Sequence, residues 1–281
     1  MTTAISVSED DAKYCLNQLR DQSPDFYLSS LLLPSAVRAD IVALHTFHTE
    51  VSGITLASPE PIAGEIRLQW WMEVLNRQRE EEAAQHPLAR SLLSVMEAHN
   101  LPAGVLVSKL EAHIFDLYSD PMGDQEMLEA YFGETRSALF QLAALIIEKE
   151  AGPNLANVSG HAGVATGCIS ILENLARHRA QHHVYFPSDL LTKTDLNAEQ
   201  FLLTSDSRHS KAVSSLVEIA ELHFSKAVSA LKTVPPDFKP IFAPLALVPV
   251  YLKRIRKRPE TALNGISPVS QLARQWALWR F

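Results

Sequence analysis

A helical spacing of apolar residues, interrupted mainly at prolines, is the feature that most limits what this chain can fold into. From Ser35 to Ile54, directly after Pro34, apolar residues give the predicted helix so broad an apolar surface that we expect it to be buried. No strand-like alternation competes with this spacing along the 281 residues. Glycine is scarce, with 10 residues, whereas strong helix formers are plentiful. The sequence therefore predicts an all-α fold.

The predicted helices cover most of the chain. Ser8 is the expected cap of a first helix over 12–20, with acidic residues near its positive end. The further predicted helices are 35–54, 62–82, 87–100, 103–119, 127–150, 155–179, 206–233, 238–258 and 268–281. We expect one helical domain over 12–260, with an N-terminal tail at 1–11 and an amphipathic C-terminal segment at 261–281.

Charge and cysteine usage exclude several classes of protein. A net charge of −7 argues against a nucleic-acid partner. Cys15 and Cys168 are far apart and form no CxxC pattern, which indicates neither a disulfide framework nor a zinc site. No apolar run approaches the roughly 20 residues of a transmembrane helix, and residues 1–11 are acidic, unlike a signal or transit peptide. We expect a soluble cytoplasmic protein.

Two stretches resemble the catalytic boxes of the squalene and phytoene synthase family. Residues 43–56 read ALHTFHTEVSGITL, against a family pattern of roughly ALYAFCRxxDDxxD. Residues 172–179 read LENLARHR and are followed by VYFP at 184–187, against LTNxxRDxxED…GRxYLP. Further matching pieces lie at 22–26, 32–38, 67–71 and 251–254. The resemblance implies a single-domain helical bundle of the isoprenoid synthase type, in which the helices over 38–54 and 155–179 face each other across a central cavity.

The acidic residues of both boxes are missing. In the family these carboxylates hold magnesium ions, which in turn hold the substrate's diphosphate. Ser52, Gly53 and Leu56 stand where the first box has its acids, and His178 stands at the leading acid of the second. Glu50 cannot substitute, because two helical residues rotate it by about 200° from Ser52. The resemblance therefore implies no catalytic residue, no metal and no cofactor.

The pattern of loss resembles a catalytically degenerate branch of this family, which includes the phytoene-synthase-like assembly factors of respiratory complex I. Tyr131 to Leu139, reading YFGETRSAL, is one stretch that is similar to that branch. The resemblance implies a non-catalytic binding or assembly factor for complex I (NADH:ubiquinone oxidoreductase), with complex I subunits or assembly intermediates as partners. Two alternatives stay open: a prenyltransferase that uses Mg²⁺ and farnesyl or geranylgeranyl diphosphate at an atypical site, and an isoprenoid- or lipid-binding protein.

Several polar and aromatic residues fall at positions that would line a ligand pocket in the family. These candidates are Ser23, Phe26, Arg38, His48, Glu50, Asn174, Arg177, Tyr185 and Tyr251. The histidines allow three interpretations. A transition metal could bind to His45, His48, His178 and His182, because imidazole suits such metals. A phosphate-bearing lipid or nucleotide could bind to His178 with Arg177 and Arg179. Otherwise these side chains fill a vestigial cavity.

The C-terminal part of the chain has a composition of its own. A basic run begins at Lys253 and ends at Arg258, and it precedes Trp276, Trp279 and Phe281. A basic cluster beside an aromatic amphipathic helix is typical of an interfacial membrane anchor. This pattern predicts peripheral contact with the inner membrane through 253–281. The same surface would serve for docking on a partner protein, or the tryptophans would close the helical core.

Overall fold

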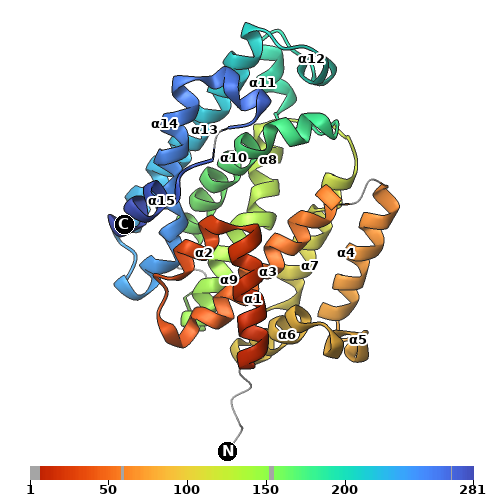
Figure 1. The fold of residues 1–281 in the computed structure, drawn as a ribbon, viewed down its shortest axis with the longest axis vertical. Helices are drawn as coiled ribbons and strands as arrows, with labels where there is room; N and C mark the ends of the chain where they lie inside the picture. Colours follow the sequence, from red (N-terminus) through yellow and green to blue (C-terminus); the bar gives the residue numbers. More distant parts are fainter. Residues whose placement is uncertain (1–6, 58–59, 152–154, 267) are drawn as a thin grey trace, which may run out of the picture. The chain divides into compact units, whose positions relative to one another are not determined.

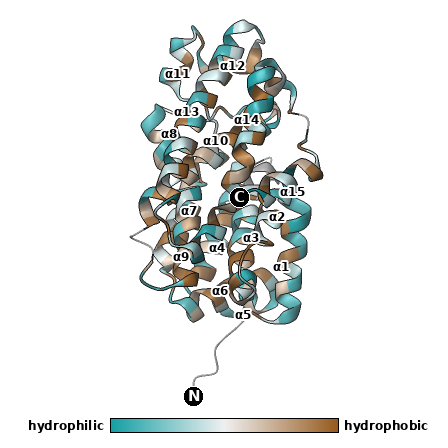
Figure 2. Ribbon diagram, turned by 90° about the vertical axis from the view of Figure 1, so that its left-hand side faces the viewer, coloured by the Kyte–Doolittle hydropathy of each residue, from teal (hydrophilic) through white to brown (hydrophobic). Residues whose placement is uncertain are grey.

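A computed structural model of this protein describes residues 7–57, 60–151, 155–266 and 268–281, with the side chains of 55–57 left out. All regular elements among the described residues are helical, and none is a β-strand (Figure 1). This confirms the predicted all-α class. Along the helices, hydrophobic and hydrophilic residues alternate on the same ribbon, as in amphipathic helices (Figure 2). No described helix is both long and apolar enough to cross a lipid bilayer.

The chain forms two compact units, and each is assembled from separate segments. The first unit comprises residues 1–117, 138–156 and 234–243, and the second comprises 118–137, 157–233 and 244–281. The predicted domain at 12–260 is therefore distributed over both units, whereas the predicted segment at 261–281 lies within the second unit. Residues 1–6 of the predicted tail lie outside the described part, and the first helix begins within that tail, at Glu9.

The first unit is built around one long helix. Helix α3 (Ser35–Ala57) packs against several other helices of this unit, and Ile41, Leu44, Phe47 and Val51 on it are fully buried. Its neighbours include α1 (Glu9–Gln22), α2 (Pro24–Ser30), α4 (Pro61–Leu75), α6 (Pro87–His99) and α9 (Ala138–Ile147). Further elements are α5 (Glu80–Gln85), α7 (Ala103–Ala112) and a 3₁₀ turn at Phe115–Leu117.

Local sequence explains most helix ends in this unit. The hydroxyl of Ser8 accepts a hydrogen bond from the backbone N–H of Asp11 at 3.2 Å, which confirms the predicted cap. The predicted helix over 62–82 is divided, because Arg77 takes a left-handed conformation with φ 60° after α4 ends. Within α4, Trp71 is buried, whereas Trp70 is half-buried and its indole N–H donates to Glu82 at 2.8 Å.

The second unit contains two 25-residue helices, α10 (Ala156–Ala180) and α13 (Ser207–Leu231). Helix α13 packs against α14 (Val248–Lys257) and a 3₁₀ segment at Pro259–Asn264, and α14 contacts α15 (Gln271–Trp279). The shorter helices are α8 (Gln125–Phe132), α11 (Ser188–Lys193) and α12 (Ala198–Leu203). Helices α11 and α12, like α2, were not predicted.

Two predicted long helices are not continuous. The helix expected over 127–150 is interrupted by a π-helical turn at Gly133–Ser137, which separates α8 from α9. The helix expected over 238–258 begins as a 3₁₀ segment at Pro236–Leu247, and only α14 is α-helical. Pro240 and Pro244 explain the second case, because a proline within a helix removes a donor and clashes with the preceding turn.

Glycines on α10 permit close approach to the α8 region. A Cβ atom added to Gly163 would lie 2.6 Å from the backbone nitrogen of Ser137 and 2.8 Å from its Cα, far inside van der Waals contact. A Cβ atom added to Gly167 would overlap the ring of Phe132. Packing within the second unit therefore requires glycine at both positions.

Candidate functional site

The first box lies on α3, where its two histidines point into well-packed surroundings. His45 is buried and stacks on Phe26 of α2, with ring centroids 4.4 Å apart. His48 is also buried, and the same Phe26 ring meets it edge-on at 5.9 Å. The Nδ1 atom of His48 lies 3.4 Å from the hydroxyl of Ser52, one turn further along the helix. Aromatic packing and short-range polar contacts therefore fix both imidazole rings.

A buried lysine from α7 completes this site. Lys109 has no solvent-exposed surface, and its Nζ lies 2.9 Å from His48 Nδ1. The same Nζ lies 3.2 Å from His113 Nε2. On the far side of that ring, His113 Nδ1 lies 2.6 Å from the carboxylate of Asp116. A continuous polar network thus runs from Ser52 on α3 to Asp116 in the 3₁₀ turn after α7.

The donor and acceptor roles in this network follow from its chemistry. A lysine ammonium only donates hydrogen bonds, so His48 Nδ1 and His113 Nε2 both act as acceptors. The proton of the neutral His113 ring then lies on Nδ1 and is donated to Asp116. The positive charge of Lys109 and the negative charge of Asp116 balance each other within the network. Such pairing is what allows a charged side chain to be fully buried.

This arrangement places a fixed cation beside the degenerate first box. The ammonium of Lys109 engages the Nδ1 atom of His48, and its charge opposes a second cation beside that ring. Among the described residues, no group of three or more His, Cys, Asp or Glu side chains is arranged to hold a metal ion. Two other positions of the first box also lack the family's acids. Gly53 has open space around its Cα, and the side chain of Leu56 lies outside the described part.

The remaining candidates of the first unit serve local structure. Arg38 donates to the carbonyl oxygens of Leu31 and Leu33, at 3.2 and 2.7 Å, and so fastens the turn between α2 and α3. Ser23 is the N-terminal cap residue of α2, although its side chain makes no capping bond. Burial raises the pKa of Glu50, and His86 at 3.8 Å partly opposes that rise. Glu50 therefore faces α6 and not the direction of Ser52, as its position on the helix predicts.

The second box lies on α10, in the second unit. His178 is half-buried, and its ring is 4.7 Å from that of Tyr185, which is itself buried. The ring centroid of Tyr131 lies 6.0 Å from that of Tyr185. Asn174 turns back on its own helix and donates to the carbonyl of Ser170 at 2.9 Å. An aromatic side chain thus packs against His178, at the position where the family has its leading acid.

The basic residues near the second box have different surroundings. Arg179 donates to the carbonyl oxygens of Leu202 and Thr204, and burial lowers its pKa, so it serves as a cap for the end of α12. Arg177 is exposed, as is His182, which adopts φ 60° just after the helix ends. Tyr251 on α14 is buried, and its hydroxyl accepts a hydrogen bond from Arg274 of α15 at 3.2 Å.

Sequence reasoning missed three buried polar residues of this network, which are Lys109, His113 and Asp116. A signal was nevertheless present. These residues are spaced by four and three positions, which places them on one helix face, and Leu106 and Leu110 show that this face is apolar. A lysine on a buried face needs polar partners, and that requirement would have pointed to the histidines.

Comparison with known proteins agrees with this fold and with the order of the motifs. A family profile described as squalene/phytoene synthase matches residues 19–280. The protein "NADH dehydrogenase (ubiquinone) complex I, assembly factor 6" of Bos taurus is 27% identical over 246 residues, which are 87% of this chain and 74% of that protein. Its Homo sapiens counterpart is 26% identical, again over 87% of this chain, and 73% of its own length is covered.

The fold is shared with a solved enzyme structure. The crystal structure of a dehydrosqualene synthase in complex with ligand superposes with a TM-score of 0.82, at 16% sequence identity. The alignment covers 97% of this chain and 95% of that one. At this identity the likeness concerns the fold alone. Since the family profile spans nearly the whole sequence, this chain belongs to the squalene/phytoene synthase family.

Proposed function

We propose that this chain is a non-catalytic member of its family and acts as an assembly factor for respiratory complex I. The observation that carries the proposal is the buried Lys109 ammonium, 2.9 Å from His48, beside a first box without its acids. The similarity to proteins named as complex I assembly factors supports the second half of the proposal. The partners would be complex I subunits or assembly intermediates.

The physical argument against catalysis is electrostatic. Ionising a prenyl diphosphate requires the leaving group to be neutralised, which in this family is done by metal ions held on carboxylates. Here Ser52 offers a hydroxyl, Gly53 offers no side chain, and His178 packs against Tyr185. Magnesium prefers several oxygen ligands, so these residues make a poor site for it. The balance of Lys109 and Asp116 also leaves the network without the excess negative charge that would attract a divalent cation.

The claim that the chain is non-catalytic is tested with purified protein. Farnesyl or geranylgeranyl diphosphate plus magnesium should release no pyrophosphate above a control without protein. Turnover above that control, abolished by Ser52→Ala with His178→Ala, would establish the prenyltransferase alternative instead. Calorimetric binding of farnesyl diphosphate without turnover would support the isoprenoid-binding alternative.

The proposed role in the assembly of complex I is tested in cells. Disrupting the gene should lower the amount of assembled complex I on native gels, and the intact chain should restore it. The variant with Ser52→Ala and His178→Ala should restore it equally well, because the proposed role needs no chemistry at the boxes. An unchanged amount of complex I after disruption would refute the assembly role.

We further propose that the protein contacts an anionic bilayer, at the inner membrane, through α14 and α15. Leu272, Trp276 and Trp279 are exposed by 78%, 60% and 76%, so the alternative that the tryptophans close the core is wrong. The two indole rings lie 5.4 Å apart, and Phe281 is exposed beyond them. Helix α14, which contacts α15, carries the exposed cations of the basic run. Aromatics favour the interface, and each surface cation adds about 1 kcal/mol on an anionic membrane.

Point substitutions test this contact better than truncation, since Leu278 is buried and Arg274 bonds to Tyr251. The variant with Trp276→Ser and Trp279→Ser should lose flotation with vesicles that contain phosphatidylserine, and high salt should weaken flotation of the intact protein. Leu203→Ser is a matched control, because Leu203 is exposed by 69% on α12. Equal flotation of all three proteins would refute the contact.

A further inference from the structure

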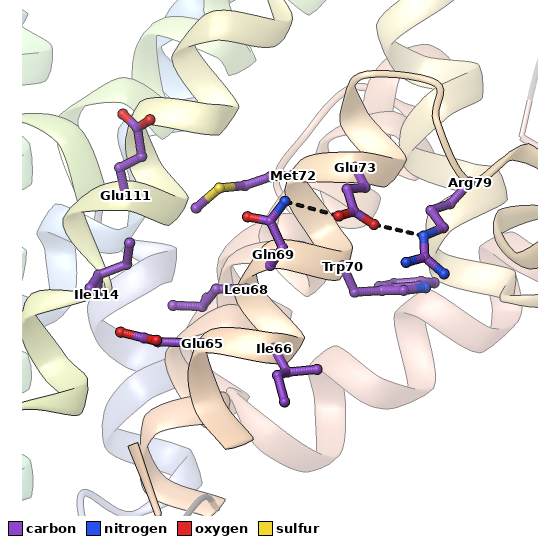
Figure 3. Close-up of a pocket in the computed structure, with 10 residues that line it drawn as sticks. All are labelled: Glu65, Ile66, Leu68, Gln69, Trp70, Met72, Glu73, Arg79, Glu111 and Ile114. Atoms are coloured by element: carbon purple, nitrogen blue, oxygen red, sulfur yellow. Dashed lines mark hydrogen bonds and ion pairs between the residues drawn. The ribbon is translucent and has the colours of Figure 1, made fainter. Parts of the chain in front are cut away.

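We propose that a groove of the first unit, between α4 and α7, binds a basic amphipathic helix of a partner protein. The groove has a volume of about 670 Å³ and lies within residues 65–114 (Figure 3). The inference rests on the assembly role proposed above, since an assembly factor must bind protein. It concerns a surface formed by α4, α7 and the segments that adjoin them.

The groove has an apolar floor and an unusually apolar edge. Leu68 and Met72 of α4 and Ile114 after α7 form the apolar part of its lining. At the edge, Ile66 is exposed by 65%, and Ile62, one turn earlier on the same face, is exposed by 69%. A single exposed isoleucine needs no explanation, but two in line beside a groove form a continuous apolar stripe. Such a stripe matches the apolar face of a helix.

The rim of the groove is acidic. Glu65 and Glu73 on α4 and Glu111 on α7 lie on its two walls, while Arg79 is the one cation among the lining residues that the structure describes (Figure 3). Arg79 is held between two carboxylates, Glu73 at 2.6 Å and Glu82 at 2.7 Å. The pKa of Glu73 is lowered by hydrogen bonds from Gln69 and Arg79, so this carboxylate is ionised at neutral pH. The lining residues therefore carry net negative charge.

The negative charge of the rim favours a partner with basic residues. A helix with leucine-like residues on one face and lysine or arginine along its flanks would place its apolar face on the stripe and its cations against the acidic rim. An anionic bilayer or a nucleic acid would be repelled by the same rim. The rim is also held in shape, because Gln69 donates to Glu73 at 2.9 Å and the indole of Trp70 donates to Glu82 at 2.8 Å.

The probe for this groove is a fluorescein-labelled designed helix with leucine at positions i, i+3, i+4 and i+7 and lysine elsewhere. Its counterpart has glutamate in place of lysine. Fluorescence anisotropy with the intact protein should show binding of the lysine peptide, weakened by salt, and no binding of the glutamate peptide. Ile66→Ser should weaken binding about tenfold, because the bound helix would cover this apolar side chain, and Glu111→Gln about threefold, because a charge at the rim stays exposed to water.

Matched control variants separate a site from general attraction to an acidic protein. Leu203→Ser removes an equally exposed apolar side chain from α12, and Glu218→Gln removes an exposed acid from α13. Both should bind the peptide as the intact protein does, with unchanged circular dichroism. If all four variants bind alike, the attraction is unspecific and the inference is wrong. A concentration-dependent dimer in sedimentation that Ile66→Ser abolishes would show that a second copy of this chain fills the groove, which also overturns the inference.

The outcomes also separate this inference from the proposed function. If the peptide binds at this site but disruption of the gene leaves the amount of complex I unchanged, the groove inference holds and the assembly role is refuted. Restoration of complex I by Ile66→Ser, together with peptide binding that this substitution does not change, would refute the groove alone.

Discussion

Replacing Lys109 by methionine tests whether the buried network is a charge-balanced part of the first unit. Methionine keeps most of the length and volume of the side chain, so the change mainly removes the ammonium and its hydrogen bonds. Those bonds join Nζ to His48 at 2.9 Å and to His113 at 3.2 Å, in a position with no solvent exposure. Bulk solvent does not reach this position.

The expected cost follows from these contacts. Removing one member of a buried charge pair typically destabilises a protein by about 3–5 kcal/mol, because the opposite charge loses its compensation. Here that opposite charge is Asp116, which is exposed by 4%. The corresponding fall in melting temperature is on the order of 10 °C for a chain of this size.

The assay is urea unfolding followed by circular dichroism, with Lys211→Met as the matched control. Lys211 is exposed on α13, so its replacement should leave the free energy of unfolding within about 0.5 kcal/mol of that of the intact protein. The double variant with Lys109→Met and Asp116→Asn removes both charges and should regain at least about 1 kcal/mol of the loss. Equal stability of Lys109→Met and Lys211→Met would refute the reasoning, and so would a double variant that is as unstable as the sum of its parts.

Two further predictions concern the second unit. Gly163→Ala should destabilise by about 1–3 kcal/mol, because its Cβ meets the backbone of Ser137, whereas Gly160→Ala, with open space, should be neutral or stabilising in the same urea titration. Burial lowers the pKa of His223, so the folded protein binds fewer protons here than the unfolded chain. Its contribution to stability is therefore full above about pH 6.5 and is lost as the pH falls below that value. His223→Gln should flatten this decline in melting temperature; an unchanged slope would contradict the assignment.

The degenerate boxes were predictable because their positions are defined along the chain. Helical spacing places Ser52 one turn after His48 and sends Glu50 to another face, and the structure has both. The cap at Ser8 was an equally local inference. The interruption of 127–150 was missed, because a π-helical turn leaves the apolar spacing of its flanking helices largely intact.

Several candidate ligand residues have structural contacts that no sequence pattern revealed. Arg38 bonds to two carbonyls of the preceding turn, and Arg179 bonds to the end of α12, although both were candidates for contact with a ligand. A guanidinium has five donors and satisfies them with whatever acceptors the fold brings near. Which acceptors those are depends on how turns and helices meet, which the residue type does not determine.

The sequence alone determined the helical class, the family and the loss of acids at both boxes, because these depend on residue identity and on spacing along one helix. Only the tertiary structure decided what replaced the acids. Lys109 and His48 are 61 positions apart, and their contact exists because helices α7 and α3 belong to one compact unit. The exposure of Trp276 and the groove beside Ile66 were likewise decided by packing, since a periodic apolar face is the same in sequence whether another helix covers it or not.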